Sequence, residues 1–383
     1  MKLTVIFVSS YLPRKCGIAT FTDDLVKNLE KINVNVHCRI VAIEDKKYRY
    51  NRRVKFRINQ KEKESFLAAA DWLNNSKADL INLQHQFLLY GEEGEFTRSF
   101  LNRIKLPIIT TIHTLSTQPT KREKEAIKAI LRKSKKVTVM INYAQDILKK
   151  VYQAPEEKVV VIPHPVPEIE KIDRERAKSE LGLKGNIIST FGLIRRDKGI
   201  EYAIEALPEI LKEHPKTFYL VIGKTHPSHQ AKEGERYREE LSEKAEKLGV
   251  RKNVKFINRF LPLKELAGYL CATDIFLTPY LGAEQVSSGA LIYGLSLGRI
   301  CISTPFSYAK EILSSGRGIL IEFRKSRAIA EAVNRILKDE KLRKNMEGKA
   351  YQYGRNLPWS EVAKRYLKLF QESKQTEKNS LNL

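Results

Sequence analysis

The chain of 383 residues contains few cysteines, few methionines and no long run of apolar residues. Its four cysteines are widely separated and form no Cys-x-x-Cys pair, which argues against a disulfide-stabilised scaffold or a zinc ribbon. The longest apolar stretches fall far short of the roughly 20 residues that a membrane-spanning helix needs. The N-terminus begins with a strand-like run and lacks the layout of a signal peptide, so we expect a cytoplasmic protein.

The composition is that of a folded protein with a strong positive charge. Hydrophobic residues make up 42% and charged residues 30%, enough to bury a core in each of two domains. The net charge of +24 is spread over both halves, which keeps anionic ligands, anionic membrane surfaces and nucleic acids open as partners. Many Lys and Glu with only three Met also fit a heat-adapted protein, a thermophile.

Runs rich in Val and Ile alternate with helix-like stretches along the whole chain, a pattern typical of α/β domains with a parallel sheet covered on both faces. The predicted strands are residues 3–10, 36–43, 80–87, 107–113, 137–141, 159–163, 187–194, 218–223, 254–258, 275–279 and 300–304. Three prolines within residues 163–167 interrupt the alternation, which then restarts. We therefore predict two doubly wound, Rossmann-like domains that face each other across a cleft, at residues 1–165 and 166–357, then a helix at 358–373 and a flexible tail at 374–383.

One loop after a predicted strand in the first domain suits an anionic ligand. It contains Gly17 and opens a helix, whose free N–H groups favour a diphosphate. An ordinary turn between a strand and a helix remains the alternative, because a single glycine is not a G-x-G-x-x-G fingerprint.

Two similar loops follow strands of the second domain. One carries Arg195, Arg196 and Lys198 just before a helix, where they suit phosphate binding, although a solvated loop is the alternative. The other carries Ser287, Ser288 and Gly289, which offer backbone donors to phosphate oxygens or simply cap the helix.

Several short motifs occur in a familiar order. They are the first loop with Gly17, Gln84-His-Gln86, Thr111-Ile-His-Thr114, Val161-Ile-Pro-His164, Phe191–Gly199, Gly223-Lys-Thr-His-Pro227 and Leu297–Pro305. In these motifs the chain resembles glycosyltransferase family 4, the group 1 glycosyltransferases, over nearly its whole length. The resemblance implies the GT-B fold, with the C-terminal helix after Trp359 crossing back to the N-terminal domain.

The resemblance also implies roles for individual residues. Lys198 and an arginine contact the donor diphosphate. The family's usual arginine position holds Leu193, so Arg195 or Arg196 substitutes, and Arg195 is favoured because we expect Arg196 to face solvent. His113 and His85 lie on the acceptor side, His113 near the reacting carbon, although each also fits a structural histidine. The implied catalytic residues are His113, Lys198 and Arg195, and the implied donor-binding residues are Gly17, Gly192, Arg196, Gly223, Gln285, Ser287, Ser288, Gly289 and Tyr293.

The chain departs from the family at the Glu-x7-Glu motif. Gln285 stands where the first glutamate contacts the sugar, and Tyr293 stands where the second binds the ribose. The amide of Gln285 can still bond to sugar hydroxyls, but Tyr293 cannot accept two ribose hydroxyls as a carboxylate does. The resemblance therefore implies a donor site that differs from the family's usual pattern.

The activity that the resemblance implies is a metal-independent, retaining transfer of a hexose, glucose or mannose, from a GDP-, UDP- or ADP-sugar to a sugar or lipid-linked acceptor. No cofactor is expected, because the nucleotide sugar is a substrate. Two alternatives follow from the missing glutamates: a phosphorylase that uses a sugar 1-phosphate, or a non-catalytic GT-B protein that binds a sugar or a partner.

Two stretches concentrate positive charge. Residues 121–136 hold eight basic residues beside a narrow apolar stripe, which suits either the solvated face of a packed helix or peripheral contact with an anionic membrane. Residues 46–57 are more basic still and interleave aromatic residues. That pattern suggests nucleic acid, but the chain lacks a recognised nucleic-acid module, so we do not expect this partner.

Overall fold

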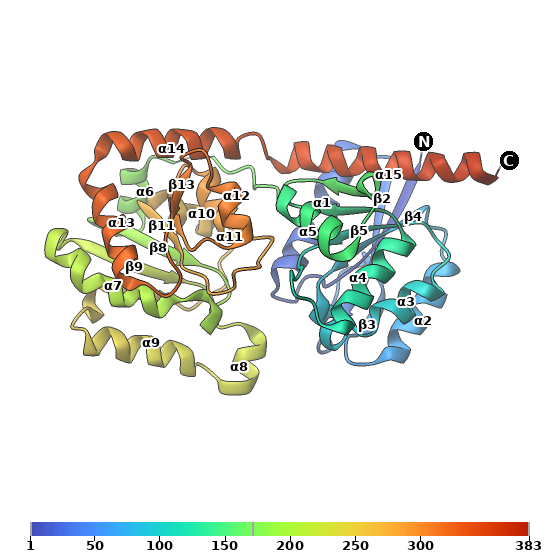
Figure 1. Ribbon diagram of the computed structural model, residues 1–383, viewed down its shortest axis with the longest axis horizontal. Coiled ribbons are helices and arrows are strands. Elements are labelled where there is room, and N and C mark those ends of the chain that lie inside the picture. Colours follow the sequence, from blue (N-terminus) through green and yellow to red (C-terminus); the bar gives the residue numbers. More distant parts are fainter. Residues whose placement is uncertain (1, 171, 382–383) are drawn as a thin grey trace. The chain divides into compact units, whose positions relative to one another are not determined.

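The computed structural model describes residues 2–170 and 172–381, without the side chains of residue 228 and residues 376–381. The described chain divides into two compact units. The first comprises the residues up to Pro165 together with those from Trp359 onward, and the second runs from Val166 to Pro358. Each unit is a parallel β-sheet between two layers of helices, which confirms the predicted α/β class (Figure 1).

The sheet of the first unit has seven strands in the order β3-β2-β1-β4-β5-β6-β7. Its strands are β1 (Leu3–Ser9), β2 (Val36–Glu44), β3 (Val54–Asn59), β4 (Leu80–His85), β5 (Ile108–Ile112), β6 (Ser134–Val139) and β7 (Val159–Val161). Strands β1, β4 and β5 are buried at every position. They lack polar alternation because helices cover both faces of the sheet.

The helices of the first unit form two groups by their contacts. Helix α1 (Gly17–Ile32) packs against α15 (Trp359–Leu381), which returns from the far end of the sequence. The other group is α2 (Lys63–Asn74), α3 (Thr97–Arg103), α4 (Lys121–Lys133) and α5 (Asn142–Tyr152). Helix α15 continues to Leu381 and so passes the predicted helix end at residue 373, while residues 382 and 383 of the predicted tail lie outside the described residues.

The sheet of the second unit has six strands in the order β10-β9-β8-β11-β12-β13. Its strands are β8 (Asn186–Phe191), β9 (Thr217–Ile222), β10 (Val254–Ile257), β11 (Ile275–Thr278), β12 (Ile300–Ser303) and β13 (Gly318–Leu320). In both sheets the order reverses beside the first strand of the unit. The carboxyl ends of the strands at such a reversal are where open α/β sheets bind ligands.

The longer helices of the second unit also group by their contacts. Helix α7 (Ile200–Glu213) packs against α9 (Arg236–Lys247) and α13 (Ser326–Lys338). Helices α6 (Arg174–Glu180) and α10 (Leu263–Ala272) form one contacting pair, and α11 (Gly289–Ser296) and α14 (Glu340–Gly354) form another. The short helices α8 (Pro227–Glu233) and α12 (Ser307–Ile312) complete the unit.

Strand β3 begins near the end of the basic and aromatic run at residues 46–57, where the sequence pattern had suggested no strand. It forms the edge of the first sheet, so only part of its surface needs to be apolar. Charged residues such as Lys55 and Arg57 are tolerated on an edge strand, where they discourage pairing with another chain.

Candidate functional site

Three glycines shape the carboxyl edge of the second sheet. Gly192 and Gly223 follow the neighbouring strands β8 and β9 with φ of 140° and 133°. A Cβ at Gly223 would overlap the carbonyl oxygen of Gly192, and a Cβ at Gly199 would overlap that of Pro279. A Cβ at Gly192 would meet nothing within 4 Å, so the backbone there borders open space where a ligand can approach.

Lys198 lies at this same edge, immediately before α7. Its Nζ is 3.6 Å from the centroid of the Tyr280 ring, which follows strand β11. Desolvation lowers the pKa of Lys198 to about 8, with Asp197 opposing and Arg195 reinforcing the shift. A largely desolvated cation beside the N-terminus of a helix is a strong partner for an anionic group.

The two arginines of this loop have different partners. Arg195 Nε lies 2.6 Å from Asp197 Oδ1. Arg196 is exposed and forms ion pairs with Glu240 and Glu233 while its guanidinium covers the Tyr237 ring. The hydrogen bonds to Glu240 raise the pKa of Arg196. Arg196 is thus held by α8 and α9, whereas Arg195 stays within the Lys198 loop.

The third predicted loop makes mostly local contacts. Ser288 caps α11, because its Oγ accepts a hydrogen bond from the backbone N–H of Leu291 at 3.2 Å. Gln285 Nε2 donates to the carbonyl oxygen of Ser287 at 2.7 Å. Gly289 is the first residue of α11. The side chains of Ser288 and Gln285 are therefore oriented by the loop itself.

Tyr293 lies on α11 and packs against the end of strand β8. Its ring centroid is 6.1 Å from that of Phe191, the residue before Gly192. An aromatic ring at this position offers no carboxylate.

Gly17 opens α1 in the first unit, after strand β1. Cys16 precedes it as the N-cap and makes no side-chain capping bond. A Cβ at Gly17 would meet nothing within 4 Å, so open space borders the start of this helix as well. The position agrees with the predicted use of its free N–H groups, which stays a prediction.

A chain of buried amides leads to His113. Asn82 Nδ2 donates to the carbonyl oxygen of Ile109 at 3.2 Å, which leaves its Oδ1 to accept from Gln84 Nε2. Gln84 Oε1 must then accept, and it lies 2.7 Å from His113 Nε2. Because Gln84 Oε1 can only accept a hydrogen bond, this series of hydrogen bonds assigns the proton of a neutral His113 to Nε2.

An aromatic ring packs against His113. Phe21 on α1 contacts it edge-on with centroids 5.2 Å apart, and also contacts His164 and Trp359 at 5.6 and 5.3 Å. Desolvation, with the nearby His164 and His85, lowers the pKa of His113 to about 3. His113 is therefore neutral at physiological pH. Phe21, Gln84 and Tyr280 were not assigned roles from the sequence, because only the fold brings them to these positions.

His85 lies in the core of the first unit. It is fully buried, stacks on Tyr90 at 5.2 Å, and its Nε2 is 3.4 Å from Thr97 Oγ1. Burial lowers its pKa to about 3. This position favours the structural alternative for His85 over contact with an acceptor.

The basic stretch at residues 121–136 forms helix α4 and the start of β6. Its apolar residues, including Ile127 and Ile130, are buried, so the helix packs on the unit with its basic side chains outward. None of the helices in the described part of the chain is long and apolar enough to cross a membrane. Among the same residues, no cluster of three or more His, Cys, Asp or Glu could hold a metal ion.

Solved structures with the same fold define the class. Sucrose-phosphate synthase from Thermosynechococcus elongatus superposes with a TM-score of 0.81 at 17% identity, over 97% of this chain and 99% of that one. Anabaena HepE in complex with UDP-glucose superposes with a TM-score of 0.76 at 13% identity, over 97% and 100%. The fold is that of the GT-B glycosyltransferases, as predicted.

Two family models match consecutive parts of the chain. The model described as glycosyltransferase family 4 matches residues 16–168, and the model described as glycosyl transferases group 1 matches residues 171–353. Together the two models cover most of the chain, which belongs to the group 1, or family 4, glycosyltransferases. A D-inositol 3-phosphate glycosyltransferase from Corynebacterium urealyticum is 25% identical over 51% of this chain. That match spans 46% of the relative, so the chain covers about half of its length.

Proposed function

We propose that this protein is a retaining glycosyltransferase that moves a hexose, glucose or mannose, from a nucleotide sugar to a sugar or lipid-linked acceptor. The observation that carries the proposal is Lys198, a desolvated cation held against Tyr280 at the carboxyl edge of the second sheet. Family membership supports it, and Anabaena HepE, which shares the fold, has been crystallised with UDP-glucose. UDP-sugars are therefore the first donors to test, with GDP- and ADP-sugars beside them.

The proposed chemistry depends on stabilising the leaving diphosphate. Lys198, Arg195 and the free N–H groups at the start of α7 are the groups that would share its developing negative charge. Removal of one such donor commonly costs roughly 3–4 kcal/mol of transition-state stabilisation. We propose that these cations serve in place of a metal ion and that no cofactor takes part.

The protonation state of His113 limits the role that we propose for it. A ring with a pKa of about 3 is neutral near pH 7, so it cannot act as a general acid and is only a weak base. We propose that the neutral ring of His113 lies on the acceptor side and helps to orient a substrate hydroxyl. Phe21 and Gln84 would keep the ring in position.

A specific observation favours a second candidate, a phosphorylase that uses a sugar 1-phosphate. Tyr293 packs on Phe191 at the position where the family resemblance expects a carboxylate for the ribose. A donor without a ribose needs no such carboxylate. Lys198 would then bind the single phosphate.

The experiment that tests the proposal measures nucleotide release from UDP-, GDP- and ADP-sugars with a mixed pool of sugar acceptors and no added metal. We expect release from one donor class, and its loss in Lys198→Ala. Lys212→Ala is the matched control, because Lys212 is an exposed lysine on α7. Phosphate release from glucose 1-phosphate or mannose 1-phosphate without any nucleotide turnover would favour the phosphorylase, and silence with every donor would contradict both activities.

A further inference from the structure

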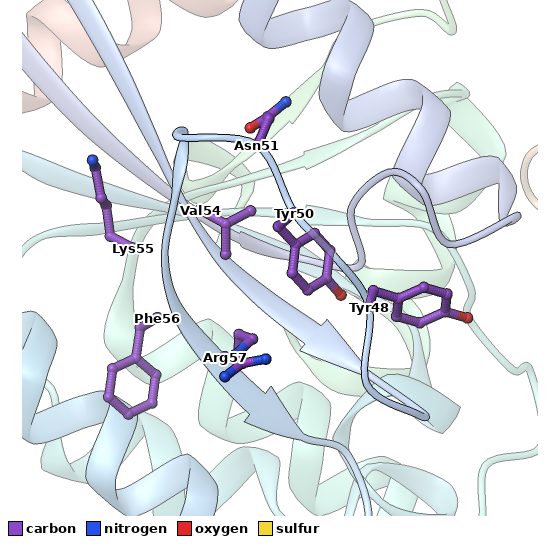
Figure 2. A pocket seen from close by; sticks show the side chains of 7 residues that line it. All are labelled: Tyr48, Tyr50, Asn51, Val54, Lys55, Phe56 and Arg57. Carbon is purple, nitrogen blue, oxygen red and sulfur yellow. The ribbon is translucent and has the colours of Figure 1, made fainter.

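A hollow of about 510 Å³ lies at the edge of the first sheet. It is bordered by strand β3 and by the extended segment that leads into it from β2, and its lining residues are Tyr48, Tyr50, Asn51, Val54, Lys55, Phe56 and Arg57. In Figure 2, Tyr50, Val54 and Arg57 gather on one side of the strand, with Tyr48 farther along the segment. A volume of this size falls within the range of sites for small ligands.

Two tyrosines, Tyr48 and Tyr50, supply aromatic surface to the hollow. Tyr48 Oη donates to Asp45 at 3.0 Å, and the two ring centroids lie 5.9 Å apart. Burial, with Glu44 close by, raises the pKa of Tyr50. Lys46 Nζ lies 5.6 Å from the centroid of the Tyr48 ring, so a cation accompanies this aromatic surface. Flat aromatic faces suit the apolar C–H face of a sugar ring.

Arg57 supplies positive charge on the strand side of the hollow. It is exposed, and no ion pair within residues 2–170 and 172–381 involves it. By contrast, Arg53 on the same stretch pairs with Glu30 at 2.5 Å. Since a guanidinium binds carboxylates and phosphates through a planar pair of N–H donors, Arg57 is suited to an anionic group.

The hollow adjoins the loop that opens α1. Arg14 in that loop donates to the carbonyl oxygen of Ile43 at 3.1 Å and to Gln60 Oε1 at 2.9 Å, which ties the loop to the ends of β2 and β3. Arg14 and Cys16 both lie close enough to influence the Tyr48 hydroxyl. A ligand in the hollow would thus lie beside the loop before Gly17.

We propose that this hollow binds a saccharide that carries a carboxylate or phosphate group, with its ring against Tyr48 and Tyr50 and its charge on Arg57. This inference deepens the proposed function, because it names an anionic glycan as the class of acceptor. In that respect it rests on the proposed function. Binding itself requires no donor and no turnover. A failure of transfer activity would therefore leave the binding result intact.

The test titrates the full chain with tetragalacturonate, maltotetraose and inorganic tripolyphosphate in a calorimeter, without nucleotide sugar. We expect tetragalacturonate to bind about tenfold more tightly than either comparator, because it alone offers both a sugar face and a charge. Glucose 6-phosphate and glucose form a second pair of ligands. Comparison of this pair with tetragalacturonate and maltotetraose shows whether a phosphate or a carboxylate supplies the charge that is bound. Binding of either charged sugar above its neutral partner supports the proposal.

Three variants locate the site. Arg57→Gln and Tyr50→Ala should each weaken the binding of the charged sugar about tenfold, whereas Arg52→Gln, an exposed arginine outside the hollow, should not. Thermal melting checks that each variant is folded. Because Arg57 is exposed, its replacement keeps the proposal testable should Tyr50→Ala unfold.

Four results would overturn the proposal. They are equal weakening by Arg52→Gln, equal binding of tripolyphosphate, equal binding of the neutral sugars, and no binding of any charged sugar. Single-stranded RNA that binds more tightly than tetragalacturonate, with the same loss in Arg57→Gln, would assign the surface to nucleic acid instead.

Discussion

Gln84 accepts a hydrogen bond from Nε2 of His113 at 2.7 Å, and both side chains are buried in the first unit. The orientation of the Gln84 amide follows from Asn82, which is itself oriented by the carbonyl of Ile109. A backbone carbonyl thereby determines which nitrogen of a histidine carries the proton. We propose that Gln84 positions His113 through this hydrogen bond.

Gln84→Glu should raise the pKa of His113 well above its value of about 3, because a carboxylate stabilises the imidazolium. NMR titration of the His113 ring measures this directly, and the acidic limb of the activity profile should move to higher pH with it. Gln118→Glu is the control, since Gln118 is exposed elsewhere in the same unit. An unchanged ring pKa would contradict the assigned hydrogen bond.

Lys198 should impose an alkaline limit on activity. Its pKa of about 8 means that the cation is lost as the pH rises through 8, so kcat/KM should fall above that pH. Lys198→Arg keeps the charge at all accessible pH values and should remove this limb even if it lowers the rate. A wild-type profile that stays flat to pH 10 would show that the Lys198 charge is not needed.

Two glycine substitutions should change stability in opposite directions. Gly223→Ala forces a Cβ into the carbonyl of Gly192 at a φ of 133°, so we expect a loss of several kcal/mol or failure to fold. Gly268→Ala in α10 meets nothing within 4 Å and should stabilise by about 0.5–1 kcal/mol. Urea denaturation of both variants measures the difference, and equal tolerance of the two would be inconsistent with the close approach of the strand ends.

Asp24 on α1 should make folding depend on pH. Burial, reinforced by Asp23 and opposed by Lys27, raises its pKa from 3.8 to about 6. A carboxyl with a raised folded-state pKa favours the native state when protonated, so its contribution to stability is lost as the pH rises from about 4 to 6. Asp24→Asn should therefore stabilise the protein by about 1–2 kcal/mol at pH 7 and hardly at all at pH 4, as measured by denaturation at both pH values.

Peripheral membrane contact through residues 121–136 stays a prediction with a direct test. Flotation with vesicles that contain phosphatidylserine at low salt should recover the protein, because each nearby cation contributes about 1 kcal/mol. Reversal of charge at Lys124, Lys128 and Arg132 on the outward side of α4 should abolish recovery. The same reversal at three lysines of α14, Lys341, Lys344 and Lys349, should not, and no flotation of the wild type would refute the idea.

The sequence alone determined the α/β class, most of the strands and the loops that carry Gly17, Lys198 and Ser288. These features depend on local patterns, since apolar runs, prolines and glycines act through neighbouring residues. The family resemblance added the GT-B fold. The predicted cleft between the domains and the predicted roles of the site residues stay predictions.

Only the tertiary structure decided which residues meet. The packing of Tyr280 on Lys198, the contact of Phe21 with His113 and the amide chain through Gln84 join residues from different strands and helices. Likewise, only the structure shows that His85 is buried in the core of the first unit. It also shows that Arg196 pairs with Glu233 and Glu240, whereas Arg195 pairs with Asp197. A local sequence pattern does not encode such contacts. They depend on which distant segments exclude water from a side chain in the folded protein, and on which charges those segments bring near it.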